Sequence, residues 1–377
     1  PKNTNELIRL GKELTLDVNS NGKIDQYGLV WNFTEPFFYV PWLGGFGEWL
    51  LTDTNAPNLN TKGNEKGFRF IKSLRDEHKI IPKECDYEIA NAMFKTGRAA
   101  MIINGDWSWG DYQGVVDFGI ARIPKVSETG LWPSPLVGTK GYSINSNIKG
   151  SRLDQTIKLM KHLTSQEVQL YFTKKLNSQP SSKDALNSSL VKNNKLLKES
   201  SHVIEVGRPM PIIPEMRAIW DALREQYQAV LGGSISPDQA AKNAHVNSIK
   251  QISIMNEVIE PGIQSKIIKF ILIVALMLFF LLSYYNSPQF LVDYKKNKTA
   301  YMLFLPSFLS IVLVVIFPFV YNFFISLSNF SLRTFTNWEL IGLHHYWQVF
   351  TDYSFYVILI KTIIWTSVNI LFHLSLG

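Results

Sequence analysis

The sequence reads IIKFILIVALMLFFLLSYY from Ile267 to Tyr285, and this stretch decides the architecture of the chain. A helix rises about 1.5 Å per residue, so roughly 20 apolar residues are enough to cross about 30 Å of hydrocarbon. Two more apolar runs follow, at 300–328 and 355–377, whereas the residues before 257 have the mixed polarity of a water-soluble domain. The sequence therefore predicts a soluble domain followed by all-α transmembrane helices.

The alternative to membrane helices is that these runs form the core of a large soluble protein. Three such runs in succession make this alternative the weaker one. Pro306 and Pro318 lie inside the second run. Proline breaks the interior of a soluble helix but is tolerated in membrane helices, where neighbouring groups satisfy the freed backbone atoms.

Lysines indicate the orientation of the helices, because basic residues in short loops stay on the cytoplasmic side. Lys295, Lys296 and Lys298 lie between the first two runs, whereas the next loop carries Arg333 as its only basic residue. We therefore expect a cytoplasmic first loop, an external second loop and a soluble domain outside the membrane. The expected boundaries are 1–256 for the soluble domain, 257–266 for a linker, 267–285 for the first helix, 286–299 for the cytoplasmic loop and 329–354 for the external loop.

Two lysines argue against this orientation. Lys266 and Lys269 flank the outer end of the first helix, and the three-lysine loop outweighs them by a single charge. The chain begins at Pro1 and ends at Gly377 inside an apolar run, so we also expect the sequence to continue in both directions.

Composition excludes several kinds of site. The 38 Lys and Arg residues outnumber the 31 Asp and Glu residues, but the excess is spread over both halves and forms no basic block, so nucleic acid is not an expected partner. Cys85 is the only cysteine, which excludes an intrachain disulfide and a cysteine-rich zinc site. No histidine pattern near Cys85 supports a catalytic thiol.

The soluble part alternates helical patterns with short apolar runs, which predicts an α/β domain that holds ligands in a crevice. The sequence Thr164-Ser165-Gln166-Glu167 is similar to a capping box that opens a helix. The expected helices are 66–78, 87–95, 154–163, 168–175, 214–231 and 237–255, and the expected strands are 99–103 and 118–123.

Aromatic residues in turns and helix starts indicate a sugar site. A pyranose packs its C–H face on an aromatic ring, while its hydroxyl groups need carboxylate, amide or guanidinium partners. Glu35 lies two residues before Phe37, and Arg224 lies four residues after Trp220, so both could supply such partners. The alternative is that the aromatic residues only fill the core. The five residues in question are Phe37, Phe38, Trp107, Trp109 and Trp220.

Residues 1–256 resemble the second two-thirds of a maltose-binding-type, or carbohydrate ABC transporter, solute-binding protein. The motifs that carry the resemblance are EPFF at 35–38, FKTGRAAM at 94–101, NGDWSW at 104–109 and PMPIIPEM at 209–216, followed by Trp220.

This resemblance implies a periplasmic-binding-protein-like two-lobe α/β fold, incomplete because the first portion of the amino-terminal lobe is missing. It also implies that Trp107 and Trp220 stack on sugar rings and that the segment with Glu35, Phe37 and Phe38 contacts sugar. Asp106 and Asp221 depart from the family pattern, so the sugar need not be maltose.

Residues 294–377 resemble the start of the inner-membrane permease subunit of the same transporters. The resemblance rests on Ala300-Tyr301, Leu305-Pro306, Pro318 with Tyr321, and Ile341-Gly342-Leu343 with Tyr346. It implies a second permease subunit and separate ATP-binding subunits that hydrolyse ATP. The loop that engages the ATPase in this family would follow Gly377.

Asp17 opens a segment that is similar to the start of a calcium loop. Position 6 is Gly22, but position 12 is Gly28 where such loops have glutamate. Calcium binding would need a carboxylate from elsewhere, and an Asn-Gly turn explains the same residues. The candidate ligand positions are Asp17, Asn19, Asn21, Lys23 and Asp25.

We therefore expect a protein that captures a sugar or oligosaccharide and passes it to its own permease. It would lie in the bacterial inner membrane as a multi-pass protein, with the binding domain on the extracytoplasmic side. The alternatives are a membrane-anchored sugar sensor and, with less support, a glycosidase that uses Glu35 and Asp106. The residues do not specify which sugar is bound.

Overall fold

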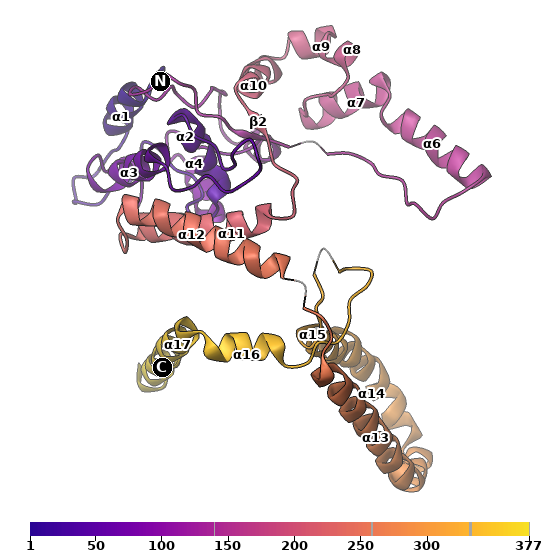
Figure 1. Ribbon diagram of the computed structural model, residues 1–377. Coiled ribbons are helices and arrows are strands. Elements are labelled where there is room, and N and C mark those ends of the chain that lie inside the picture. The colour runs from indigo at the N-terminus through magenta and orange to yellow at the C-terminus, as the bar shows by residue number, and fades with distance from the viewer. Residues whose placement is uncertain (139, 258, 332–333, 377) are drawn as a thin grey trace. The chain divides into compact units, whose positions relative to one another are not determined.

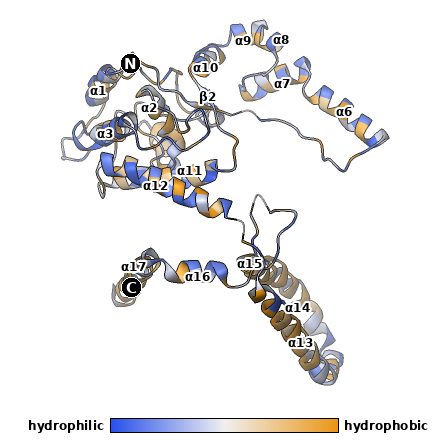
Figure 2. Ribbon diagram, viewed as in Figure 1, coloured by the Kyte–Doolittle hydropathy of each residue, from blue (hydrophilic) through white to orange (hydrophobic). Residues whose placement is uncertain are grey.

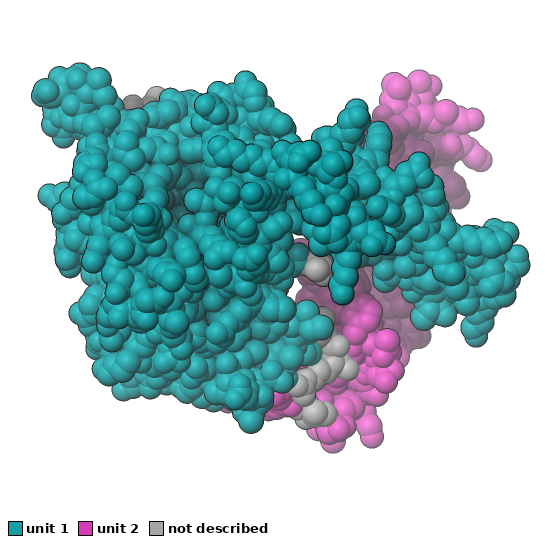
Figure 3. Space-filling model, turned by 90° about the horizontal axis from the view of Figure 1, so that it is seen from above, with its two compact units in different colours: residues 1–254 teal, residues 255–377 magenta. Residues whose placement is uncertain are grey.

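The computed structural model describes residues 1–138, 140–257, 259–331 and 334–376. Its internal contacts divide the chain into two units, Pro1–Ile254 and Met255–Gly377, which Figure 3 colours separately. Arg333, which entered the orientation argument, lies outside the described residues.

Short helices make up most of the regular structure in the first unit (Figure 1). Its two short strands, β1 and β2, pair in parallel. The elements up to residue 256 are α1 (Thr4–Glu13), η1 (Pro36–Phe38), α2 (Val40–Gly45), α3 (Lys62–Asp76), α4 (Tyr87–Lys95), η2 (Asp106–Ser108), α5 (Trp109–Tyr112), β1 (Leu136–Val137), α6 (Ser151–Leu163), α7 (Gln166–Leu176), α8 (Lys183–Leu186), α9 (Ser189–Lys192), α10 (Lys195–Glu205), β2 (Arg208–Pro209), α11 (Met216–Gly232) and α12 (Pro237–Asn256).

Capping side chains set where several helices begin. Asp86 accepts a hydrogen bond from the backbone N–H of Ile89, and α4 has the bounds that the sequence predicts. Thr61 caps α3 in the same way, so this helix starts four residues before the predicted 66–78. Ser165 caps α7 by accepting from the Val168 N–H, so this helix starts at Gln166, two residues before the predicted 168–175, while Thr164 ends α6.

The two predicted strands have different outcomes. Residues 99–103 pair in parallel with an earlier segment, through bridges from Ala99 to Tyr27 and from Ile102 to Val30. These bridges are isolated, so the predicted strand is not continuous. The prediction for 118–123 is wrong, because no strand is assigned there in the part of the chain that the structure describes. Phe118 instead packs against a small hydrophobic cluster.

The core of the first unit combines aliphatic side chains with several aromatic residues that are fully buried. Tyr39 stacks on Phe68 of α3 with ring centroids 4.5 Å apart. The ring centroid of Tyr227, in α11, lies 5.6 Å from that of Tyr39. The indole N–H of Trp31 donates to the Tyr227 hydroxyl over 2.7 Å. Helix α11 is therefore fastened to a segment far away in sequence through the centre of the core.

The second unit consists of long apolar helices, and Figure 2 shows hydrophobic residues along most of α13 and α14. Among the residues that the structure describes, three helical stretches are able by length and composition to cross a membrane, at 265–296, 298–326 and 353–375. The elements are α13 (Ile263–Lys296), α14 (Lys298–Ile311), the π-helical turn η3 (Val312–Ile316), α15 (Phe317–Ser326), α16 (His344–Thr351) and α17 (Tyr353–Leu376).

Three details of this unit differ from the sequence-based expectation. The first helix continues to Lys296, so most of the loop expected at 286–299 is helical. The second run is interrupted by η3 directly before Pro318, which cannot donate a hydrogen bond to the carbonyl of Val314. The loop expected at 329–354 contains the helix α16.

We expect Tyr227→Phe to lower the free energy of unfolding by about 1–3 kcal/mol, because it leaves the buried Trp31 indole N–H without an acceptor. Urea denaturation of the full chain in detergent, followed by near-ultraviolet circular dichroism, measures this. The matched control is Tyr171→Phe, at a side chain that is 57% exposed. Equal stabilities of the two variants would contradict a structural role for the Trp31–Tyr227 bond.

Candidate functional site

Helix α11 contributes the polar half of the candidate site. Trp220 and Arg224 lie one turn apart on this helix, and both donate to the same carboxylate oxygen of Glu35, over 3.2 Å from the indole nitrogen and 3.1 Å from Nη2. Arg224 also donates to Asp221 over 2.7 Å. The side chains of Glu35 and Arg224 are 39% and 34% exposed, so a ligand can reach them.

These charges stabilise one another. The hydrogen bond and the charge of Glu35, with a further contribution from Asp221, raise the pKa of Arg224 above its usual value. The guanidinium is therefore always charged here, and it holds the Glu35 carboxylate in place. The Nε atom of Arg224 is buried and has no hydrogen-bond partner among the described residues.

The aromatic half of the site contains Phe37 and Trp107. Their ring centroids lie 5.5 Å apart with the planes tilted by 60°. Trp107 is 51% exposed, which is unusual for a tryptophan, and its indole N–H donates to the Tyr87 hydroxyl over 3.0 Å. The Trp107 ring is thus held in place while much of its surface remains open.

Gly105 allows the Trp107 ring to lie against the backbone. A Cβ atom at this position would lie 2.2–2.4 Å from three carbons of the indole. The backbone angles of Gly105, φ −92° and ψ 168°, are accessible to any residue. The requirement for glycine here comes from the indole and not from the conformation of the chain.

A buried polar cluster supports the loop that carries Trp107. Asn91 of α4 accepts through its side-chain oxygen from Asn104, over 3.0 Å, and from the Tyr112 hydroxyl. Asn104 also donates to Tyr112 over 2.8 Å and accepts from the N–H of Gly105 over 2.9 Å. Helix α4 therefore holds Trp107 at two points, through this cluster and through Tyr87. Sequence reasoning missed the cluster, because single Asn and Tyr residues carry no motif.

The structure corrects the expectation for two of the aromatic residues. Phe38 is 5% exposed and belongs to the main core, where it packs edge-on against Phe37. Trp109 is 9% exposed and packs with Val191 and Leu197 in the smaller cluster. Both residues fill hydrophobic cores, because a helical turn that presents one ring to solvent must direct the neighbouring ring inwards. Trp107 is exposed, whereas Glu35, Phe37, Trp220 and Arg224 are half-buried, and Phe37 and Trp220 pack against the main core.

The segment expected to bind calcium forms a closed loop. A two-way backbone pairing between Leu16 and Gln26 closes it. The carboxylate of Asp17 accepts from the N–H groups of Asn21 and Gly22, and Asp25 accepts from Val18 over 2.9 Å. The side-chain oxygens of Asn19 and Asn21 likewise accept from backbone N–H groups of the loop, the latter from Lys23. These contacts fit an Asn-Gly turn, and calcium binding stays a prediction.

Cys85 is a poor nucleophile in this structure. The side chain is buried, and burial, assisted by the nearby charge of Asp86, raises the pKa of the Cys85 thiol to about 12. Because the thiolate is the reactive form, the thiol stays inert near neutral pH.

Comparison with known proteins identifies relatives of the first unit. The model of the bacterial extracellular solute-binding protein family matches residues 1–199. The maltotriose-binding protein of Pyrococcus abyssi is 26% identical over 212 residues, which is 55% of this chain and 46% of the relative. The galactooligosaccharide-binding protein of Bacillus subtilis is 22% identical over 238 residues, 60% of this chain and 56% of the relative. The chain spans about half the length of the curated relatives it matches.

Solved structures show the same similarity. The maltose/maltodextrin-binding domain MalE from Bdellovibrio bacteriovorus, bound to maltotriose, is 58% identical, with a TM-score of 0.62 and 67% of both chains covered. A cyclo/maltodextrin-binding protein complexed with maltotetraose is 25% identical, with a TM-score of 0.60, 68% of this chain and 66% of that chain covered. These neighbours support the expected periplasmic-binding-protein-like fold.

We expect Gly105→Ala to displace the Trp107 indole and to weaken its bond to Tyr87, because the new methyl group occupies the position of the ring. Incorporation of 5-fluorotryptophan and ¹⁹F NMR of the full chain measures this, with Trp107→Phe to assign the resonance. The control is Gly110→Ala, where an added methyl group meets no atom within 4 Å. A Trp107 resonance that is unchanged in Gly105→Ala would refute the proposed packing.

Proposed function

Because this chain belongs to the bacterial extracellular solute-binding proteins, we propose that its first unit captures a maltooligosaccharide for import. The observation that carries the proposal is the convergence of Trp220, Arg224 and Glu35 on the segment whose Phe37 packs against the exposed Trp107. The relatives are solute-binding proteins and not enzymes, and we propose no catalytic residue.

The chemistry of a glucose oligomer matches both halves of this site. Each pyranose has an apolar C–H face that packs on an indole or phenyl ring, and Trp107 offers half of its surface for such a contact. The hydroxyl groups of the sugar can donate to the half-buried carboxylates of Glu35 and Asp221. Because the ion pairs already hold these groups in place, little side-chain entropy is lost on binding.

We further propose that the second unit is the start of a permease and that its three long helices cross the membrane. Support comes from their length, from their composition and from the prolines that the second helix accommodates. A receptor joined to its permease in one chain reaches an effective concentration in the millimolar range, on the order of that for short flexible linkers. A sensor needs only one or two spans, so three helices favour transport.

The remaining parts of this transporter are proposed as partners. ATP hydrolysis would take place on separate ATP-binding subunits, and a second permease subunit would complete the pathway. The protein would lie in the bacterial inner membrane with residues 1–254 on the extracytoplasmic side. The curated relatives include a maltooligosaccharide ABC transporter solute-binding lipoprotein of Streptococcus pneumoniae, which supports a transporter of this class.

We expect the full chain to bind maltotriose, and Trp107→Ala or Trp220→Ala to weaken binding about a hundredfold, that is by about 2–3 kcal/mol, because each substitution removes an apolar stacking surface. Isothermal titration calorimetry of the detergent-solubilised chain measures this. Trp132→Ala is the matched control, since that indole contacts Arg122 and Lys125 instead of the site. Unchanged affinity in both site variants would show that the sugar binds elsewhere, and absence of binding by the unaltered chain would refute sugar capture.

We expect a cysteine at position 187 to react with a membrane-impermeant maleimide in intact spheroplasts, and a cysteine at position 296 to react only after permeabilisation. Asn187 and Lys296 are both exposed, so each variant reports the side of the membrane on which it lies. Cys85 is buried and does not compete for the reagent. The opposite pattern of labelling would invert the topology and remove the receptor from the outer face.

A further inference from the structure

Helix α16 (His344–Thr351) has two chemically distinct faces. At 3.6 residues per turn, Leu343 at its N-cap, Trp347 and Phe350 lie along one side, because they are spaced by four and three residues. We call these three residues the apolar face. The polar face consists of His344, His345 and Gln348.

The polar face of α16 is already occupied by the protein. His345 Nε2 lies 3.0 Å from the carbonyl oxygen of Ser328, and Gln348 donates to Glu257 over 3.4 Å. The other carboxylate oxygen of Glu257 lies 4.0 Å from Nε2 of His344. These contacts fix the rotation of α16 about its own axis and therefore the direction of the opposite face.

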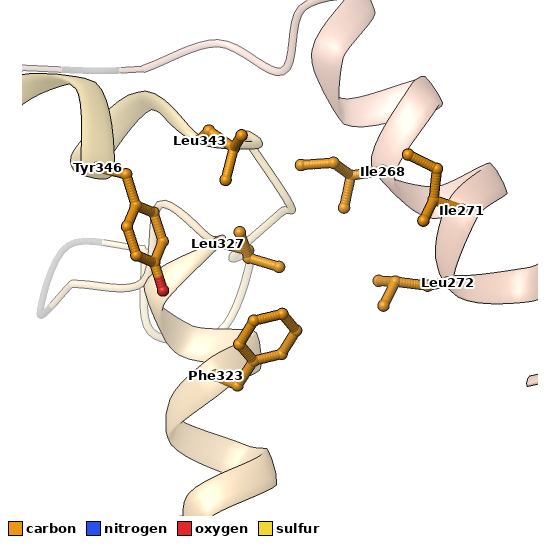
Figure 4. Close-up of a pocket in the computed structure, with 7 residues that line it drawn as sticks. All are labelled: Ile268, Ile271, Leu272, Phe323, Leu327, Leu343 and Tyr346. Atoms are coloured by element: carbon orange, nitrogen blue, oxygen red, sulfur yellow. The ribbon is translucent and has the colours of Figure 1, made fainter. Parts of the chain in front are cut away.

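The apolar face is open. Leu343, Trp347 and Phe350 are 56%, 71% and 54% exposed. Leu343 also borders a pocket of about 320 Å³, whose lining side chains face one another across a gap in Figure 4. The pocket is lined by Ile268, Ile271 and Leu272 of α13, Phe323 of α15, and Leu327, Leu343 and Tyr346.

The chain places α16 directly at the end of a membrane-crossing stretch. Asp352 is the only residue between α16 and α17, and consecutive Cα atoms are about 3.8 Å apart. The last residue of α16, Thr351, therefore lies within about 8 Å of the first residue of α17. At this depth a bilayer presents the boundary between headgroups and acyl chains, where tryptophan and tyrosine are enriched.

We propose that α16 lies in the plane of the membrane surface, with its apolar face inserted into the boundary between lipid headgroups and acyl chains. The proposal rests on the membrane insertion of α17 that is part of the proposed function. It also gives the polar face a role. Glu257 follows the last helix of the receptor, and its contacts with His344 and Gln348 attach this part of the linker to a helix at the membrane surface.

Spin labels test the proposal in the full chain reconstituted in phosphatidylcholine vesicles. Labels are attached to Trp347→Cys and Phe350→Cys on the apolar face and to Gln348→Cys as the matched control on the polar face. Ile364→Cys, in the middle of α17, reports membrane insertion, and Asn187→Cys reports water. Cys85 stays unlabelled because it is buried and its thiol is protonated. The measurement is the ratio of collisions with oxygen, which concentrates in lipid, to collisions with a water-soluble nickel chelate.

We expect ratios at positions 347 and 350 to be severalfold higher than at 348 and 187, and lower than at 364. Ratios at 347 and 350 equal to that at 187 would overturn the proposal, because the face would then lie in water. Few collisions with either reagent would also overturn it, since another protein or a second copy of the chain would then cover the face. If 364 is lipid-exposed in these cases, the membrane part of the proposed function survives. A water-exposed 364 would refute both.

Discussion

The hydrogen bond from Trp31 to Tyr227 is the contact on which the rest of the first unit depends. It joins residues 196 positions apart at the centre of an aromatic core, so it docks α11 against a segment that precedes it by most of the domain. Tyr227 lies three residues after Arg224 on the same helix. When α11 is seated by its buried face, Trp220 and Arg224 are necessarily brought to Glu35. The polar half of the site is thus a consequence of core packing.

The two halves of the site are held by different physical means. On the polar side, charged groups compensate one another at partial exposure, and the guanidinium of Arg224 serves two carboxylates at once. On the aromatic side, neutral hydrogen bonds within a buried cluster fix the loop of Gly105 and leave the Trp107 ring open. Such a cluster is stable only when all its polar groups are paired. Both arrangements hold the side chains of the site in place before binding, so less side-chain conformational entropy is lost when a ligand binds.

The second unit is proposed to lie in lipid, where every backbone polar group needs a partner within the protein. Continuous helices satisfy this requirement, and α13 does so for 34 residues. The second helical stretch contains Pro318, which lacks an N–H and so cannot make the usual backbone hydrogen bond. The chain forms a π-helical turn before this proline, and the helix continues beyond it. The polar loop residues beyond these helices pair with one another around Glu257, Ser328 and α16.

Local sequence was sufficient to locate the longer helices and to propose residues for the candidate site. Helix α4 has the predicted bounds, because Asp86 and the apolar spacing after it are local signals, and the apolar runs predicted the long helices since spanning length is a property of the chain alone. The motifs also identified Trp107, Trp220 and Glu35. Tertiary structure decided which aromatic rings are exposed: Trp109 lies two residues after the exposed Trp107 and is nevertheless buried, as is Phe38. It also decided that Tyr87 and Asn91 support Trp107. Burial and hydrogen-bond partners depend on which distant segments meet, and no local pattern encodes that meeting.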